Sequence, residues 1–264
     1  MRIGVFDSGI GGLSTLLACL RYLPDAHFIF YGDSAYSPYG DKTPTTVQRR
    51  TEAAYTWFVR AGVDAVVLAC NTATSAAVAP LRALADVPII GIEPAIKKAL
   101  NEHPEGEILL LATAMTVAGE KLHVLLNRLE GGASKVRPIA CAGLAEIIES
   151  QACNWEDQVR HYLQVTVLPH CGRNTQAIVL GCTHYCWIHD PIAEVLGTHL
   201  ALVDGNDGVA RQLCRSLDIS LATQSPPELP ERAFISLYFT AEQAEKTRIA
   251  HQLLASQGVL IQSS

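Results

Sequence analysis

Residues 65–74 read AVVLACNTAT, and residues 177–186 read AIVLGCTHYC. Aligned without a gap, both stretches give an alanine, three aliphatic residues, Ala or Gly, a cysteine and a short polar run. A continuous apolar run of this kind is typical of a strand buried on both faces of a parallel sheet. We therefore expect each stretch to end a buried strand by presenting one thiol, Cys70 or Cys182. The likeness indicates an internal duplication, with a period too long for a solenoid repeat.

The rest of the chain repeats one pattern, in which a short aliphatic run is followed by a Gly-rich or polar turn and a helical stretch. This alternation predicts a doubly wound α/β architecture. The predicted strands are 2–6, 27–31, 65–69, 88–91, 107–111, 135–139, 176–180, 200–203 and 234–239. The predicted helices are 12–22, 44–61, 75–85, 94–102, 117–129, 155–168, 190–196, 208–217 and 241–256.

The duplication predicts two similar doubly wound domains with mostly parallel sheets. We expect the first domain to comprise residues 1–93 and 206–264, and the second residues 94–205. The chain is expected to cross between them near 92–95 and 203–207. Residues 225–230 contain three prolines and are predicted to form a surface loop.

The composition describes a globular chain of 264 residues, of which 49% are hydrophobic and 17% charged. The net charge of −6, with both signs interspersed, argues against nucleic acid or a membrane surface as the main partner. No apolar run approaches the roughly 18 residues that cross a bilayer. The N-terminus has no signal-peptide pattern, so we expect a cytoplasmic protein whose eight cysteines are free thiols.

Polar side chains follow the predicted strands at their carboxyl ends, where open parallel sheets bind ligands. Asp7 follows the first strand, Cys70 the third and Cys182 the seventh. The other polar residues expected nearby are Ser8, Tyr39, Asn71, Thr72, Thr113, Thr116 and Thr183. Together they predict a small site that is rich in hydroxyls and amides and poor in Arg and Lys, suited to holding carboxylates. Two thiols from two similar halves suit a reaction on both faces of one carbon.

Three cofactor alternatives find weak support in these residues. The DSGIGG turn supplies Gly9 and Gly11 of a dinucleotide fingerprint, but Ser14 stands at the third glycine position. Its glycines fit better the close approach of backbone N–H groups to a small anion. Cys182, His184 and Cys186 have metal-ligand character without a distant second pair of ligands. None of the six lysines directly ends a predicted strand beside either cysteine, so a pyridoxal phosphate Schiff base is unsupported. We predict no cofactor and no metal.

The chain resembles the glutamate racemases of the aspartate/glutamate racemase family. The motifs that carry the resemblance are VFDSGIGGLS (5–14), YGDSAYSPYG (31–40), ACNTAT (69–74), GIEP (91–94) and GCTHY (181–185), in the order of the family. The resemblance implies cofactor-independent proton transfer that interconverts L- and D-glutamate and supplies D-glutamate for peptidoglycan. It also implies pseudo-twofold symmetry, an active site in the cleft between the domains and glutamate as the ligand, and is compatible with a homodimer.

Site residues carry over from the resemblance position by position. It implies that Cys70 takes the α-proton of D-glutamate and Cys182 that of L-glutamate. Asp7 is expected beside Cys70, and His184 beside Cys182. Glu149, in the helix expected after Cys141, corresponds to an acid near the site. The substrate-binding pairs are Asp7-Ser8, Tyr39-Gly40, Asn71-Thr72 and Thr183-His184.

The chain departs from the family after GCTHY, where Cys186-Trp187-Ile188 replaces the usual Pro-Leu-Leu. A proline there would fix the start of the following helix. Three other functions stay open at this point. They are racemisation of aspartate by the same two thiols, a non-catalytic glutamate-binding protein, and a hydrolase that uses one cysteine. The hydrolase would leave the second strand-end thiol without a role.

Overall fold

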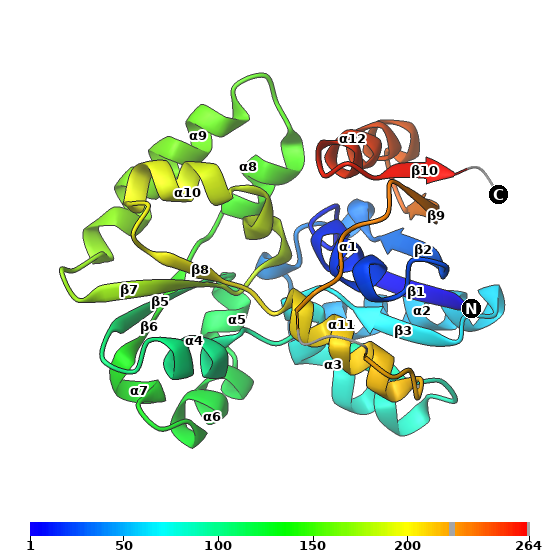
Figure 1. The fold of residues 1–264 in the computed structure, drawn as a ribbon, viewed down its shortest axis with the longest axis horizontal. Helices are drawn as coiled ribbons and strands as arrows, with labels where there is room; N and C mark the ends of the chain where they lie inside the picture. Colours follow the sequence, from blue (N-terminus) through cyan, green and yellow to red (C-terminus); the bar gives the residue numbers. More distant parts are fainter. Residues whose placement is uncertain (222–224, 263–264) are drawn as a thin grey trace. The chain divides into compact units, whose positions relative to one another are not determined.

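The structure is a computed structural model, and it describes residues 1–221 and 225–262. The chain forms two compact units. Unit 1 comprises residues 1–92 and 206–264, and unit 2 comprises residues 93–205. Both are α/β units with parallel sheets, as the sequence predicts (Figure 1).

Unit 1 is built on a six-stranded sheet with the order β10-β9-β2-β1-β3-β4, and every neighbouring pair in it is parallel. The strands are β1 (Arg2–Asp7), β2 (His27–Gly32), β3 (Ala65–Leu68), β4 (Ile89–Gly91), β9 (Arg232–Phe239) and β10 (Leu260–Gln262). The helices are α1 (Leu13–Tyr22), α2 (Pro44–Ala61), α3 (Asn71–Leu84), α11 (Asn206–Ser216) and α12 (Gln243–Ser256). Two 3-10 turns, Ser34–Tyr36 and Tyr39–Asp41, follow β2.

Unit 2 is built on a four-stranded parallel sheet with the order β6-β5-β7-β8. The strands are β5 (Glu107–Ala112), β6 (Val136–Ala140), β7 (Thr175–Leu180) and β8 (Ala201–Val203). The helices are α4 (Ile96–Glu102), α5 (Ala114–Ala118), α6 (Glu120–Arg128), α7 (Gly132–Lys135), α8 (Leu144–Ser150), α9 (Trp155–Tyr162) and α10 (His189–Leu196).

The central strands of unit 2 are covered on both faces. Along β5, Leu109 and Leu111 pack into one hydrophobic core, whereas Ile108 and Leu110 pack into a second core on the opposite face. Residues of α8, α9 and α10 share the first core, and residues of α4 and α6 share the second. Because successive side chains of a strand point to opposite faces, a continuous apolar run is required here. This two-sided burial confirms the doubly wound layers predicted from the sequence.

The nine predicted strands are confirmed, with ends that move by one or two residues. The tenth, β10, was missed because it is short and pairs only with the edge strand β9. The predicted helix 117–129 is wrong, because Gly119 in an extended conformation separates α5 from α6. In the predicted helix 155–168 only α9 is α-helical. It continues as a π-helical turn and a short 3-10 turn that contains Pro169, which has no backbone N–H to donate.

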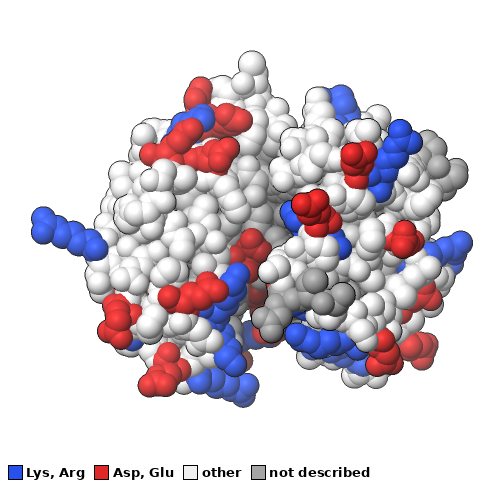
Figure 2. Space-filling view, viewed as in Figure 1, with Lys and Arg blue, Asp and Glu red and all other residues white. Residues whose placement is uncertain are grey.

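The surface carries both charge signs. On the face drawn in Figure 2, Lys and Arg side chains are interspersed with Asp and Glu. Among the described residues, no helix is both long enough and apolar enough to cross a bilayer.

Candidate active site

Both sheets place a cysteine at the same topological position. When the first four strands of unit 1 are numbered along the chain, their order across the sheet is second, first, third and fourth, as β2-β1-β3-β4. The four strands of unit 2 have the same arrangement, as β6-β5-β7-β8. In such sheets the strand order reverses between the first and third strands, and ligands bind at the carboxyl ends there. Cys70 follows the third strand of unit 1, and Cys182 follows the third strand of unit 2.

Cys70 is buried at the start of α3 and forms the N-cap of this helix. Its Sγ accepts a hydrogen bond from the backbone N–H of Ala73 at 3.4 Å. Backbone N–H groups at a helix N-terminus stabilise negative charge, so this position favours a thiolate when the proton leaves. The cap also explains why α3 begins at Asn71, four residues before the predicted start.

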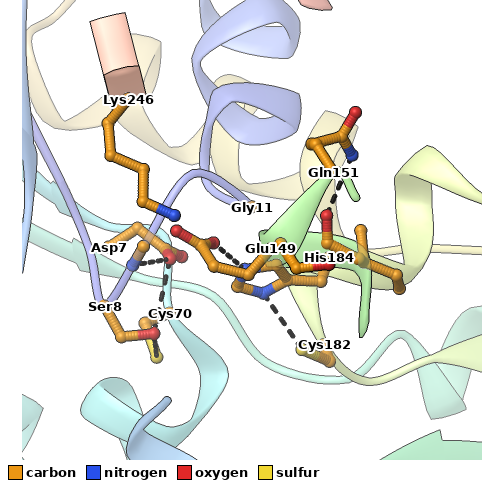
Figure 3. A network of polar contacts seen from close by, with 12 residues as sticks. Asp7, Ser8, Gly11, Cys70, Glu149, Gln151, Cys182, His184 and Lys246 are labelled. Carbon is orange, nitrogen blue, oxygen red and sulfur yellow. Dashed lines mark hydrogen bonds and ion pairs between the residues drawn. The ribbon is translucent and has the colours of Figure 1, made fainter. Parts of the chain in front are cut away.

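A chain of hydrogen bonds leads from Cys70 to Asp7, the last residue of β1 (Figure 3). The Cys70 thiol donates to Ser8 Oγ at 3.8 Å, and the Ser8 hydroxyl donates to Asp7 Oδ1 at 3.5 Å. The same Asp7 oxygen accepts the backbone N–H of Gly9 at 2.8 Å. Asp7 is fully buried. The three side chains therefore form a path along which a proton can pass from the thiol to a carboxylate.

Gly12 makes this arrangement of Asp7 possible. A Cβ at Gly12 would lie 2.6 Å from Asp7 Cβ and 2.9 Å from Ala69 Cβ. These separations are far below van der Waals contact, and both neighbours are fully buried. The DSGIGG turn thus uses this glycine to bring α1 against the end of β1, and no dinucleotide is needed to explain it.

Cys182 has different neighbours, as Figure 3 shows. Its Sγ lies 3.7 Å from His184 Nδ1, and His184 Nε2 lies 2.6 Å from Glu149 Oε2. The imidazole is buried, and Glu149 comes from α8, the helix expected after Cys141 from the resemblance although absent from the helices predicted by the apolar pattern. The thiol, the imidazole and the carboxylate form a second path for a proton.

The Cys182 path contains an imidazole with a raised pKa. Burial by itself lowers the pKa of His184, but the hydrogen bonds to Cys182 and Glu149 outweigh it and raise that pKa well above its ordinary value. This raised pKa favours the protonated form of the imidazole. A 3-10 turn at Thr183–Trp187 follows Cys182, and α10 begins at His189, so the turn that carries His184 forms with Cys186 in place of the proline expected from the resemblance.

Tyr39 and Gly40 lie after β2, in a loop that is fixed by hydrogen bonds to the buried carboxylate of Asp33. The Tyr39 hydroxyl donates to Asp33 Oδ2 at 2.6 Å, and Arg50 donates to both Asp33 oxygens at 2.8 and 2.6 Å. Thr240 also donates to Asp33, at 2.9 Å. Asp33 is fully buried, and these hydrogen bonds occupy its carboxylate, so it is a brace for the loop.

The remaining predicted site residues are all buried at the carboxyl ends of strands. Thr113 follows β5 and caps α5 by accepting the Thr116 backbone N–H at 3.2 Å, and its hydroxyl also donates to Thr116 at 3.0 Å. Asn71, Thr72 and Thr183 directly follow the two cysteines and are 6%, 2% and 3% exposed. Asn71 Oδ1 is a buried acceptor that has no hydrogen-bond partner among the described residues.

Two residues near these groups were not singled out by the sequence. Cys141 directly follows β6. Its burial, and to a smaller extent the charge of Cys182, raise the pKa of its thiol to about 12. Lys246 in α12 is only 7% exposed, and its side chain extends toward Asp7 in Figure 3. In the sequence, Lys246 could have been noticed only from its place in the first turn of the helix after β9. That place points to the site only once the order of the strands in the sheet is known.

The described residues contain no group of three or more His, Cys, Asp and Glu side chains that could hold a metal ion. The eight cysteines are free thiols. Two buried thiols at equivalent sheet positions, each with its own path for a proton, define a class of α/β protein built for acid–base chemistry with cysteine.

Comparison with known proteins identifies the family. A family model described as Asp/Glu/Hydantoin racemase matches residues 10–213, and the chain belongs to this family. It is therefore an enzyme of the racemase type, an isomerase, as the resemblance of its motifs implies.

Individual relatives agree with this assignment. A glutamate racemase of Clostridium perfringens (strain SM101 / Type A) is 37% identical over 96% of this chain and 95% of its own length. The Escherichia coli glutamate racemase, in a structure with L-glutamate and the activator UDP-MurNAc-ala, is 27% identical with a TM-score of 0.81, over 98% of this chain and 97% of that one. The RacE1 glutamate racemase of Bacillus anthracis is 25% identical with a TM-score of 0.82, over 100% and 97%.

Proposed function

We propose that this protein racemises glutamate without a cofactor, by transfer of the α-proton between two cysteines. The observation that carries the proposal is the equivalence of Cys70 and Cys182, each at the strand-order reversal of its sheet and each hydrogen-bonded to groups that can relay a proton. The glutamate racemases among its relatives support the choice of substrate.

In the direction from D- to L-glutamate, the Cys70 thiolate removes the α-proton and the Cys182 thiol donates a proton to the opposite face of the carbon. In the reverse direction the two roles exchange. One C–H bond breaks and one forms, so atoms and charge balance within the site. Before each turnover the attacking cysteine must be a thiolate, and its own proton needs an acceptor.

The two cysteines pass that proton to different groups. The Cys70 proton moves through Ser8 to Asp7, along the hydrogen bonds described above. On the other side, the Cys182 proton moves to the His184 imidazole, and the imidazolium that forms, hydrogen-bonded to Glu149, stabilises the Cys182 thiolate. General acid–base steps of this kind contribute about 10²–10⁴-fold to a rate.

Neutral groups bind the substrate in this proposal. Asn71 Oδ1 is a buried acceptor suited to the substrate ammonium group, since binding would satisfy an oxygen that is costly to bury unpaired. The Tyr39 hydroxyl is engaged by Asp33, so Tyr39 and Gly40 contribute their backbone groups. Ser8, Thr72, Thr113, Thr116 and Thr183 are the other neutral groups of the proposed binding set, and Asp7 and His184 are its two ionisable members. The two units are the proposed Cys70 and Cys182 domains, and the proposed setting is peptidoglycan synthesis in the cytoplasm.

The test is circular dichroism of L-glutamate and D-glutamate incubated with the purified chain in D₂O, without added cofactor. Racemisation with deuterium at the α-position of the product is expected. We expect Cys70→Ser and Cys182→Ser each to lower kcat by at least about 10³-fold while glutamate binding persists. Full activity in either variant would contradict the two-base mechanism.

The same assay separates the remaining alternatives. Faster turnover of aspartate than of glutamate would assign the aspartate branch of the family. Binding of glutamate by wild-type protein that racemises neither amino acid would assign a non-catalytic binding protein. Cys153→Ser is the matched control for both cysteine variants, because Cys153 is exposed and lies outside the proposed site.

A further inference from the structure

Lys246 lies at the same edge of the unit 1 sheet as Asp7. The parallel register places Asp7 opposite Gly32, and Gly32 opposite Phe239, the last residue of β9. Since neighbouring strands lie about 4.8 Å apart, Asp7 and Phe239 are separated by about 10 Å. Helix α12 begins four residues after Phe239, and Lys246 belongs to its first turn. This position brings a long cationic side chain within reach of the end of β1.

The ammonium group of Lys246 is withdrawn from water. The side chain is 9% exposed, and it extends from α12 toward the Asp7 carboxyl group (Figure 3). Its contact with Glu242 Oε2 is long, at 4.0 Å, and the Glu242 side chain is 68% exposed. An ion pair with so exposed a partner contributes little to stability. A buried cation is stable only near anionic groups, and Asp7 is a fully buried acid in its path.

We propose that Lys246 is a positioning residue that keeps Asp7 ionised, so that Asp7 can accept the Cys70 proton through Ser8. The inference rests on the proposed function, because it assigns to Lys246 the positive charge that stabilises the Asp7 carboxylate before Cys70 gives up its proton. Burial disfavours a charged carboxylate, whereas hydrogen bonds from Gly9 N–H and Ser8 Oγ to Asp7 Oδ1 favour it. A cation directed at Asp7 favours the charged form further.

The other charged groups of unit 1 near Asp7 do not replace Lys246. Asp33 follows Gly32 on the neighbouring strand, but it is bound by both Nε and Nη2 of Arg50. The Arg50 charge is therefore offset by Asp33. Cys70, at the end of β3, becomes an anion when it loses its proton. Once Asp7 has taken that proton it is neutral, so Cys70 and Asp7 share one negative charge, and Lys246 balances it.

The first test compares the pH dependence of kcat/KM for three variants. Lys246→Met removes the cation, and we expect the acid limb of the profile to move to higher pH by about one unit or more, since an adjacent opposite charge shifts a carboxyl by about 1–3 units. Lys246→Arg keeps the cation and should restore most of the wild-type profile. Glu242→Gln removes only the exposed partner on α12 and should leave the profile unchanged.

Two outcomes of this test would overturn the inference. One is a Lys246→Met profile that coincides with wild type. The other is a Glu242→Gln profile that shifts as Lys246→Met does, which would reduce Lys246 to a helix-stabilising ion pair. Thermal unfolding of each variant, monitored by far-UV circular dichroism, identifies any shift that comes from loss of the fold.

The second test needs no racemase activity. The rate at which iodoacetamide modifies Cys70 is measured by peptide mass spectrometry between pH 6 and 9, with exposed Cys153 in the same digest as the internal control. We expect Lys246→Met to slow modification of Cys70 at least about threefold near pH 8 and to leave Cys153 unchanged, because loss of the cation disfavours the thiolate. Equal Cys70 rates in both proteins would overturn the role of Lys246. Absence of racemisation by wild-type protein would overturn the proposed function instead.

Discussion

His184 is the residue whose ionisation most directly joins the structure to reactivity. Its pKa is raised well above the ordinary value by hydrogen bonds to Cys182 and Glu149, against the opposing effect of burial. An imidazolium beside a thiol favours the thiolate, which is the reactive form. The chemistry at Cys182 therefore depends on a partner two residues away and on a carboxylate from another helix.

Replacing His184 should make Cys182 less reactive. In His184→Gln we expect iodoacetamide to modify Cys182 at least about tenfold more slowly at pH 7, with Cys70 changed less than twofold. Glu149→Gln should give a smaller decrease, because the imidazole stays in place but loses its anionic partner. Peptide mass spectrometry measures the Cys70 and Cys182 rates together in one digest of each protein. A Cys182 rate unaffected by His184→Gln would contradict the imidazolium assignment.

The same pKa shift predicts how stability depends on pH. A histidine whose pKa is higher in the folded state binds its proton more tightly there, so its contribution is complete below the unfolded value of about 6.5. The contribution is lost as pH rises through the raised folded value. We therefore expect the difference in unfolding free energy between wild type and His184→Gln to be larger at pH 6 than at pH 9. Urea unfolding at both pH values measures it, and a difference that grows with pH would contradict the assignment.

Gly12→Ala tests the close approach at Asp7. The added Cβ would lie 2.6 Å from Asp7 Cβ, so either α1 or β1 must move, at a cost of about 1–3 kcal/mol. We expect racemase activity to fall with the free energy of unfolding, because Asp7 is displaced. Gly208→Ala in α11 is the matched control, since its Cβ would meet nothing within 4 Å and alanine favours a helix. Urea unfolding should show Gly208→Ala to be neutral or stabilising.

At the scale of elements, the brace around Asp33 links the loop after β2 to α2 and to the end of β9. Arg50 of α2 donates twice to Asp33, Thr240 donates to it from beyond β9, and Tyr39 donates to it from the loop itself. The Arg50 guanidinium also lies 4.0 Å from the centre of the Tyr36 ring. The brace fixes the loop that carries the proposed substrate contacts of Tyr39 and Gly40.

Arg50→Met should destabilise unit 1 and loosen this loop. Loss of one partner from a buried ion pair costs about 3–5 kcal/mol, and the Asp33 side chain is only 1% exposed. We expect KM for glutamate to rise along with this loss of stability. Arg248→Met is the matched control, because Arg248 also donates twice to a carboxylate, Glu245, but both side chains are more than half exposed. Its cost should be much smaller than that of Arg50→Met, and an equal cost for both variants would contradict the brace.

At the scale of the whole molecule, the two units differ in how the chain builds them. Unit 2 is one continuous segment with hydrophobic cores on both faces of its sheet. Unit 1 needs two segments, because β9 and β10 from the end of the chain complete its sheet next to β2. Helices α1 and α11 also join these segments, through a hydrogen bond from Thr15 to Asn206 at 2.7 Å and one from Tyr22 to Asp207 at 2.5 Å.

This difference predicts that residues 93–205 fold when expressed alone, whereas residues 1–92 do not. The isolated unit 2 keeps its cores and its sheet, and its length is ordinary for a domain. A fragment of residues 1–92 lacks β9, which pairs with one edge of β2, and α11, which is hydrogen-bonded to α1. Far-UV circular dichroism and urea unfolding should show a cooperative transition only for the 93–205 fragment. A cooperative transition for residues 1–92 would show that the C-terminal segment is dispensable.

The sequence by itself determined the α/β class, the nine main strands and the placing of Cys70 and Cys182 at strand ends. Continuous apolar runs followed by Gly-rich or polar turns are local signals, and they survive folding because a strand covered on both faces needs them. The motif resemblance also indicated the racemase family. Local pattern failed where tertiary contacts decide the structure. The local pattern did not predict β10, a short strand that forms by pairing with β9. It also predicted one helix through Gly119, where the structure has an extended residue between α5 and α6.

Only the tertiary structure decided which groups meet. Contacts between residues far apart in sequence bring Glu149 to His184 and Arg50 to Asp33, and the order of the strands places Lys246 near the end of β1. Spacing along the chain carries no record of such contacts, because strand order and helix packing set them. The two matching cysteine strands also have different chemistry. The Cys70 thiol donates to Ser8, which in turn donates to Asp7, whereas Cys182 lies beside His184, which the sequence already places two residues away.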